Sequence, residues 1–209
     1  QSSGVTVDLM GFSLTPVDLW GMNPIGRGAI YGIHVDGSTN AVIENLVIKG
    51  GRISGFYDGL YCEYMNNSRI EQMVVSGNTY DGVHFRGSAG QCNGNTIAAC
   101  TISGNGDDGF YLSGFSGQCN GNTIADCTIN DNGDLGVYLY GGTAGQCNGN
   151  TITDCTISEN GDYGIVLSGG SGQCNGNTIA DCTISGNGND GVYLSGYNGQ
   201  CNGNTLSSC

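Results

Sequence analysis

The chain has 209 residues, with 18 acidic against five basic side chains and a formal net charge of −13. This charge repels phosphate backbones and anionic lipid surfaces, and no apolar run approaches the roughly 20 residues of a membrane helix, so we expect neither nucleic-acid binding nor membrane insertion. Eleven cysteines in an acidic chain favour an oxidising location, which predicts an extracellular or cell-surface protein.

Residues 1–89 carry a less regular form of a repeat whose copies become nearly identical from residue 90 to 209, and we expect one domain over residues 1–209. Val7 is a candidate first member of an apolar column that continues through Ile43, Ile70, Ile97, Ile124, Ile152, Ile179 and Leu206. Three residues further along each copy lies a second column, with the members Leu46, Met73, Cys100, Cys127, Cys155, Cys182 and Cys209.

One segment interrupts these columns. It is TPVDLWGMNPIGRGAIYG at 15–32, which contains both prolines and the single tryptophan. We expect this insertion to cap an end of the molecule or to contact a neighbouring subunit, where Trp20 would be an aromatic anchor.

A strand is predicted after each Asp-Gly turn or its equivalent, because two apolar residues stand two apart there. These pairs are Ile33/Val35, Leu60/Cys62, Val83/Phe85, Phe110/Leu112, Val137/Leu139, Ile165/Leu167 and Val192/Leu194. Helix is a poor alternative, because glycine, asparagine, aspartate and β-branched residues occupy the positions where a helix needs good formers.

The regular copies have a fixed period. The glutamine of each GQC phrase recurs at intervals of 27, 28, 27 and 27 residues, at Gln91, Gln118, Gln146, Gln173 and Gln200. Units of this size cannot bury their apolar side alone and must stack on their neighbours. The sequence therefore predicts an all-β, single-stranded parallel β-helix of about seven coils with a period of roughly 27 residues.

The phrases GVTVDLMGFSL, AVIENLVIKGG, NSRIEQMVVSGNTYDGVHF and NTIADCTISGNGNDGVYLSG resemble repeats of the pectate-lyase-like superfamily, including its carbohydrate-binding and sugar-hydrolase types. The resemblance covers the chain from about Val5 onward and implies that the β-helix is right-handed. It selects no activity, because that superfamily contains lyases, hydrolases, epimerases, adhesins and structural fibres.

The cysteines of the regular copies occur in pairs eight residues apart, which favours a disulfide within each coil and leaves Cys62 as a buried free thiol. The predicted pairs are Cys92–Cys100, Cys119–Cys127, Cys147–Cys155, Cys174–Cys182 and Cys201–Cys209. Bonds between neighbouring coils, such as Cys62–Cys92, or along one column remain open alternatives, since stacked strands are about 4.8 Å apart. A metal site is disfavoured by the long spacing and the presence of two histidines only.

An aromatic column is predicted on the outer side of the post-turn strand. Its proposed binding members are His34, Tyr61, His84, Tyr111, Tyr138 and Tyr193. They are candidates for contacts with sugar rings or with another solenoid, although stacked tyrosines also stabilise a sheet with no binding role.

Two further sets of columns have weaker functional interpretations. Acidic side chains at Asp126, Asp154 and Asp181, and in a second column at Asp107, Asp134 and Asp162, are candidate calcium ligands, and no other cofactor is expected. Flat rows of threonine are compatible with ice binding, at Thr101, Thr128, Thr156 and Thr183 and, before the corner, at Thr96, Thr123, Thr151, Thr178 and Thr205.

The candidate catalytic pair is His84 as acid or base with Arg86 as a clamp for a substrate carboxylate. The signatures of alginate epimerases (DPHE) and polygalacturonases (GHG, RIK) are absent, so the sequence favours a non-enzyme. We therefore expect an extracellular structural protein that stacks end to end into a filament. The alternatives are a polysaccharide lyase or epimerase, a carbohydrate-binding β-helix and an ice-binding solenoid.

Overall fold

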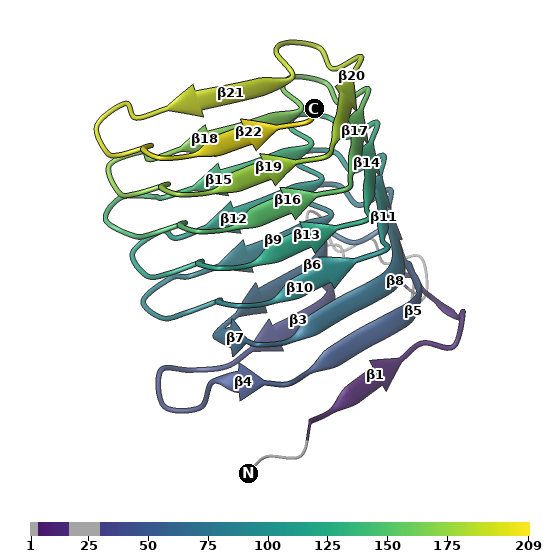
Figure 1. The fold of residues 1–209 in the computed structure, drawn as a ribbon. Coiled ribbons are helices and arrows are strands. Elements are labelled where there is room, and N and C mark those ends of the chain that lie inside the picture. Colours follow the sequence, from purple (N-terminus) through teal and green to yellow (C-terminus); the bar gives the residue numbers. More distant parts are fainter. Residues whose placement is uncertain (1–3, 17–29) are drawn as a thin grey trace, which may run out of the picture.

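The structure is a computed structural model that describes residues 4–16 and 30–209, so most of the 15–32 insertion, Trp20 included, lies outside the described residues. The chain winds into a right-handed parallel β-solenoid of about seven coils at about 27-residue spacing, and its described residues form strands and no helix (Figure 1). The predicted fold class is confirmed.

One side of the solenoid is a seven-stranded parallel sheet in the order β21-β18-β15-β12-β9-β6-β3, which we call the aromatic sheet. Its strands are β3 (Tyr31–Asp36), β6 (Asp58–Glu63), β9 (Val83–Arg86), β12 (Phe110–Ser113), β15 (Val137–Tyr140), β18 (Ile165–Ser168) and β21 (Val192–Ser195). These are the strands predicted after the turns.

The other sides belong to a thirteen-stranded parallel sheet with two arms (Figure 1). In the early coils it consists of β1 (Thr6–Asp8), β2 (Ser13–Leu14), β5 (Val47–Ile53) and β8 (Arg69–Ser76). The first arm continues through β10 (Thr96–Ala98), β13 (Thr123–Ala125), β16 (Thr151–Thr153), β19 (Thr178–Ala180) and β22 (Thr205–Ser207). The second arm continues through β11 (Thr101–Ser103), β14 (Thr128–Asn130), β17 (Thr156–Ser158) and β20 (Thr183–Ser185). A small sheet pairs β4 (Ile43–Glu44) with β7 (Met65–Asn66).

The register confirms most of the first predicted column and corrects its start. Ile97 pairs with Ile70 and Ile124, but Ile70 pairs with Ile48 rather than with Ile43, and Val7 lies beside Ile48. The start of the second predicted column is corrected in the same way, because the partner of Met73 is Gly51 and not Leu46. The coil that starts at Ile48 lacks the long GQCNGN loop and is therefore shorter than the repeat.

The interior is a single apolar core that runs the length of the solenoid. Its largest fully buried side chains include Phe85, Phe110 and the isoleucines of both arms, such as Ile97 and Ile102. Stacks of asparagine lie at the corners, where Asn95, Asn105 and their equivalents hydrogen-bond to the next coil. These asparagines therefore stabilise the corners of successive coils.

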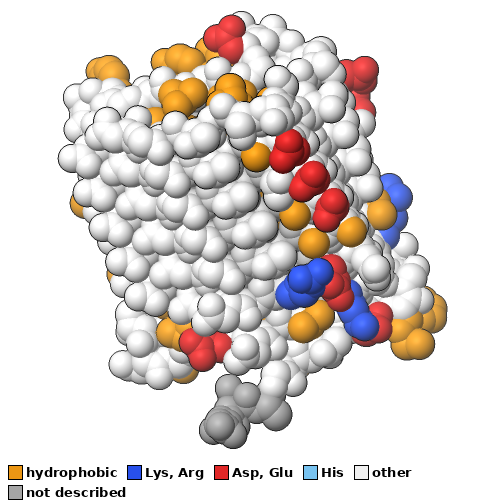
Figure 2. Space-filling view, in the orientation of Figure 1, with side chains coloured by type: hydrophobic (Ala, Val, Ile, Leu, Met, Phe, Trp, Pro, Cys, Tyr) orange, Lys and Arg blue, Asp and Glu red, His pale blue; other side chains and the backbone are white. Residues whose placement is uncertain are grey.

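The outer surface is unevenly charged. Figure 2 shows a broad face that is mostly polar and uncharged, with acidic side chains in a short oblique row and the Lys and Arg side chains near the N-terminal coils. None of the described residues belongs to a helix that is long and apolar enough to span a bilayer.

Candidate functional site

The structure brings the predicted aromatic residues into one column on the outer side of the aromatic sheet. His34 pairs with Tyr61, Tyr61 with His84, His84 with Tyr111, and Tyr111 with Tyr138. Tyr193 belongs to the same column but is separated from Tyr138 by Val166. Neighbouring rings are close, with centroids 4.9 Å apart for Tyr61 and His84 and 5.1 Å apart for Tyr111 and Tyr138.

These rings cover one another. Tyr111 and Tyr138 are stacked with 12° between their planes, and Tyr61 is only 7% exposed. Sugars contact aromatic rings through the ring face, and here the faces are occupied by neighbouring residues of the column. The column therefore presents ring edges and hydroxyl groups, and its role in binding stays a prediction.

The two candidate catalytic residues are held by neighbouring side chains. The Arg86 guanidinium donates a hydrogen bond to the Tyr61 hydroxyl at 3.2 Å, lies 3.8 Å from a Glu63 carboxylate oxygen and packs 4.5 Å from the Phe115 ring centroid. His84 lies between the rings of Tyr61 and Tyr111, and its Nε2 is buried. Arg86 is thus paired with a carboxylate of the protein itself, and the catalytic role of both residues stays a prediction.

A row of carboxylates lies beside this column, at residues that the sequence interpretation treated only as turn formers. Asp58, Asp81 and Asp108 are 2%, 0% and 5% exposed. Each accepts a backbone hydrogen bond from the next coil: Asp58 from Asp81 at 3.2 Å, Asp81 from Asp108 at 3.2 Å, and Asp108 from Leu135 at 3.0 Å. The signal available in the sequence was the recurrence of Asp directly before Gly in successive coils.

Burial changes the acidity of these groups, because a carboxylate loses its hydration there. Burial, together with the neighbouring Asp81 carboxylate, raises the pKa of Asp58 to about 6 and that of Asp108 to about 8. Burial also raises the pKa of Asp81, whereas the neighbouring His84 acts to lower it. In the ring column, burial raises the pKa of Tyr61 and of Tyr111 to about 12, so both hydroxyls stay protonated at neutral pH.

The first predicted set of calcium ligands lies elsewhere. Asp126, Asp154 and Asp181 are exposed at the corner between the two arms of the large sheet, where their φ angles are 54°, 53° and 52°. Aspartate is one of the few residue types that tolerate this left-handed conformation, so the backbone accounts for the acidic column. Among the described residues, the clusters with the spacing of a cation site are at Asp58, Asp81 and His84 and at Asp107, Asp108 and Asp134, and the second of them contains two residues of the other predicted acidic column.

All eleven cysteines are free thiols, so the predicted within-coil disulfides are not formed in the structure. The two cysteines of a coil belong to different columns. Cys119 interacts with Cys92 and Cys147, and Cys155 interacts with Cys127 and Cys182, so the thiol neighbours are in adjacent coils. Cys62 is a buried free thiol, and burial raises its pKa and that of Cys119.

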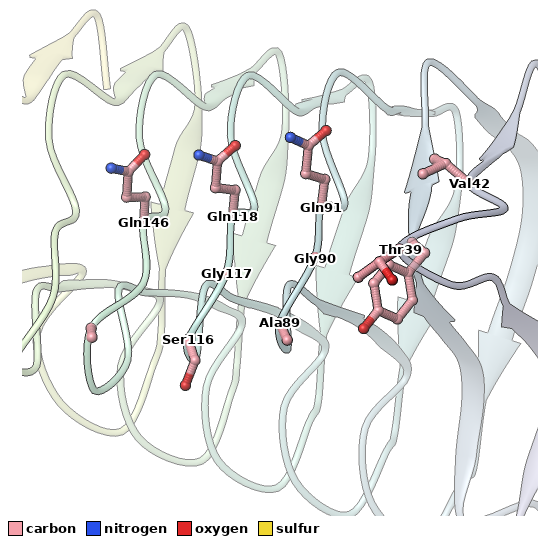
Figure 3. A pocket seen from close by; sticks show the side chains of 11 residues that line it. Thr39, Val42, Ala89, Gly90, Gln91, Ser116, Gly117, Gln118 and Gln146 are labelled. Carbon is pink, nitrogen blue, oxygen red and sulfur yellow. The ribbon is translucent and has the colours of Figure 1, made fainter.

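A groove runs along the solenoid where the chain passes from the aromatic sheet to the first arm (Figure 3). We call it the glutamine groove, because Gln91, Gln118 and Gln146 project side by side along it, and Gln173 and Gln200 continue the row. Its other lining residues are small or uncharged: Thr39, Val42, Tyr64, Ala89, Gly90, Ser116, Gly117, Ala144, Gly145, Ser171, Gly172, Asn198 and Gly199.

Each glutamine is oriented by the coil before it. The side-chain oxygen of Gln118 accepts a hydrogen bond from the Asn93 amide at 3.3 Å, and that of Gln146 accepts one from Asn120 at 3.3 Å. The oxygens are thus occupied, which leaves the NH2 groups for a ligand or for water. The floor is bare backbone, because a Cβ at Gly117 would collide with the carbonyl oxygen of Gly87.

The sequence interpretation did not identify this groove. The sequence feature that could have revealed the groove is a glutamine that recurs in every GQCNGN loop and belongs to no apolar column. A glutamine in a loop offers no charge and no unusual spacing, so only the stacking of the coils makes the row apparent.

Comparisons with known proteins agree with this architecture. The family model described as "Right handed beta helix region" matches residues 22–179, while a search of curated proteins found no match. Among solved structures, pectate lyase Pel9A is similar with a TM-score of 0.62 and 16% identity over 88% of this chain and 46% of that one. The enzymatically active domain of bacteriophage CBA120 tailspike protein 2 has a TM-score of 0.51 and 15% identity over 95% of this chain and 33% of that one. The chain thus spans about half the length of the pectate lyase, and these likenesses concern the fold alone.

Proposed function

Because the chain belongs to the right-handed β-helix family, we propose that it is a carbohydrate-binding β-helix that holds a linear, uncharged glycan in the glutamine groove. The observation that carries this proposal is the row of five glutamines, each with its oxygen occupied and its NH2 group without a protein acceptor among the described residues. The row follows the solenoid axis, so it suits a polymer rather than a compact molecule.

The spacing of the row supports a repeating ligand. Stacked coils are separated by roughly 4.8 Å, so five glutamines extend over roughly 19 Å, which is the length of a short oligosaccharide. Sugar hydroxyls accept hydrogen bonds from amide NH2 groups at this regular interval. Tyr64, whose ring packs against Gly90, adds an aromatic surface at one end of the groove.

The charge of the groove selects a neutral ligand. Among the described residues that line it, none is charged. The net charge of −13 disfavours acidic polysaccharides at long range. The groove also lacks a cation that could bind a uronate carboxylate, since Arg86 is already paired with Glu63.

The test is calorimetric titration of the whole chain with neutral oligosaccharides and with oligogalacturonate as the acidic comparison. We expect the neutral series to bind better with increasing length, and the double change Gln118→Ala and Gln146→Ala to weaken binding by about tenfold, the effect of losing roughly two hydrogen bonds. Thr128→Ala with Thr156→Ala, on the second arm, is the matched control and should bind normally. Tighter binding of the acidic series, or equal binding by both double variants, would contradict the proposal.

The other predicted functions rest on features outside the groove. End-to-end assembly into an extracellular filament, ice binding by the threonine rows and catalysis by His84 and Arg86 stay predictions.

A further inference from the structure

We propose that Asp58, Asp81 and His84 form a binding site for one divalent transition-metal ion on the outer side of the aromatic sheet. One ligand atom from each residue lies within 4.8 Å of the other two. The three residues come from β6 and from the turn and strand of β9, so the stacking of two coils assembles the site.

Two buried atoms of this cluster lack a hydrogen-bond partner. They are Oδ2 of Asp81, a residue with 0% exposure, and Nε2 of His84. Oδ2 lies 3.1 Å from Nδ1 of His84, yet the two atoms are not aligned as donor and acceptor. An ion held by Oδ2 of Asp81 and Nδ1 of His84 would give this buried oxygen the partner that buried polar groups rarely lack.

The spacing fits a shared ion. Metal–nitrogen and metal–oxygen bonds of about 2.0–2.2 Å place neighbouring ligand atoms roughly 3 Å apart, which is the separation of the Asp81 and His84 atoms. The Asp58 carboxylate is fixed beside them, because its Oδ1 accepts the backbone N–H of Asp81.

The charge balance favours a cation. Two carboxylates are buried at the site, and the nearby guanidinium of Arg86 is directed to Tyr61 and Glu63. An ion would offset the repulsion between the carboxylates at the cost of little reorganisation. The mixed set of imidazole and carboxylate ligands suits ions of the Mn²⁺ and Zn²⁺ type better than Mg²⁺ or Ca²⁺, which prefer oxygen alone.

Mn²⁺ is the suitable probe, because the eleven thiols of the chain would compete for Zn²⁺. The chain has two histidines, so its imidazole proton signals give a direct readout. After treatment of the purified full chain with a chelator, we expect Mn²⁺ to bind at one ion per chain by electron paramagnetic resonance. It should broaden the NMR signals of His84 well before those of His34, which lies two coils away in the same column.

The variants separate the site from other acidic groups. Asp81→Asn should weaken Mn²⁺ binding by about 100-fold. Asp58→Asn should have the same effect, and it is the variant to use if Asp81→Asn does not fold. Asp154→Asn, at the exposed corner, and His34→Gln should bind as the unmodified chain does. No stoichiometric binding, equal broadening of both histidines, or binding that survives Asp81→Asn would overturn the proposal and leave His84 in contact with Asp81 only. Glycan binding in the glutamine groove is measured without metal, so either result can fail alone.

Discussion

Two kinds of buried polar side chain repeat from coil to coil, and their chemistry differs. The Asn105 amide donates to Oδ1 of Asn132, and Asn132 donates to Asn160, each at 2.9 Å. An amide both donates and accepts, so this stack continues without charge. A carboxylate only accepts, so the equivalent stack of Asp58, Asp81 and Asp108 accumulates charge unless protons or a cation enter.

This difference predicts a pH effect at Asp108, whose pKa is raised to about 8 by burial and by Asp81, with Asp107 and Asp134 also facing it. The folded chain holds a proton that the unfolded chain releases above its ordinary pKa near 4, so the free energy of unfolding should fall as pH rises from about 4 to about 8. Asp108→Asn keeps the oxygen that accepts from Leu135 and removes this titration.

Urea denaturation at pH 4, 6 and 8 checks the Asp108 prediction. The variant should gain stability over the unmodified chain at pH 8 and show no such gain at pH 4. Parallel pH profiles for the two proteins would contradict it.

At the scale of the element, the corner between the two arms sets the cross-section of the solenoid. One residue of each coil has a positive φ at this corner, namely Gln72 at 55°, Ala99 at 52° and the three aspartates described above. A short polar side chain or glycine is tolerated there, whereas alanine is strained by its Cβ. The corner therefore selects residue type by backbone conformation.

Ala99→Gly should therefore raise the free energy of unfolding by about 1 kcal/mol, because the strain at Ala99 exceeds the extra flexibility of glycine in the unfolded chain. Ala98→Gly is the matched control. Ala98 is buried in β10 with an ordinary φ, so its change should destabilise by roughly 0.5–1 kcal/mol. Denaturant titration of both variants measures the difference, and a loss of stability in Ala99→Gly would refute the assignment.

The strands and loops also show which features of the fold could be predicted from the sequence. The coil period and the inward columns were predictable, because apolar residues two apart must face one core. The start of the first column was not, since AVIENLVIKGG offers both Ile43 and Ile48 and carries no loop marker. Closeness in sequence favoured Cys92 with Cys100, whereas stacking places Cys92 beside Cys119, which fits the alternative of contacts along one column. The carboxylate and glutamine rows depend on contacts between coils, which no single repeat reveals.

At the scale of the whole molecule, the two cysteine columns are continuous rows of thiols along the core. Nine of the eleven cysteines are buried, while Cys201 is half-buried and Cys209 is exposed. To react, a cysteine must be accessible to the reagent and must be deprotonated to the thiolate. Burial reduces the access and disfavours the deprotonation. The fold thus shields nine of its eleven thiols from solvent.

Alkylation with iodoacetamide followed by mass measurement should show this protection. The native chain should gain one rapid adduct, at Cys209, and the chain unfolded without reductant should gain eleven. Fewer than eleven adducts after unfolding would mean that disulfides had formed in the purified protein.

The near-identity of the coils from residue 90 onward gives the molecule an adjustable length. Each copy brings its own glutamine, its own asparagine corners and the same rise, so the junction between GQC phrases is equivalent wherever it occurs. Gain or loss of one gene segment encoding a copy would lengthen or shorten the glutamine row by a single unit while every other contact is retained. Homologous chains can therefore differ in reach without any new residue having to be selected.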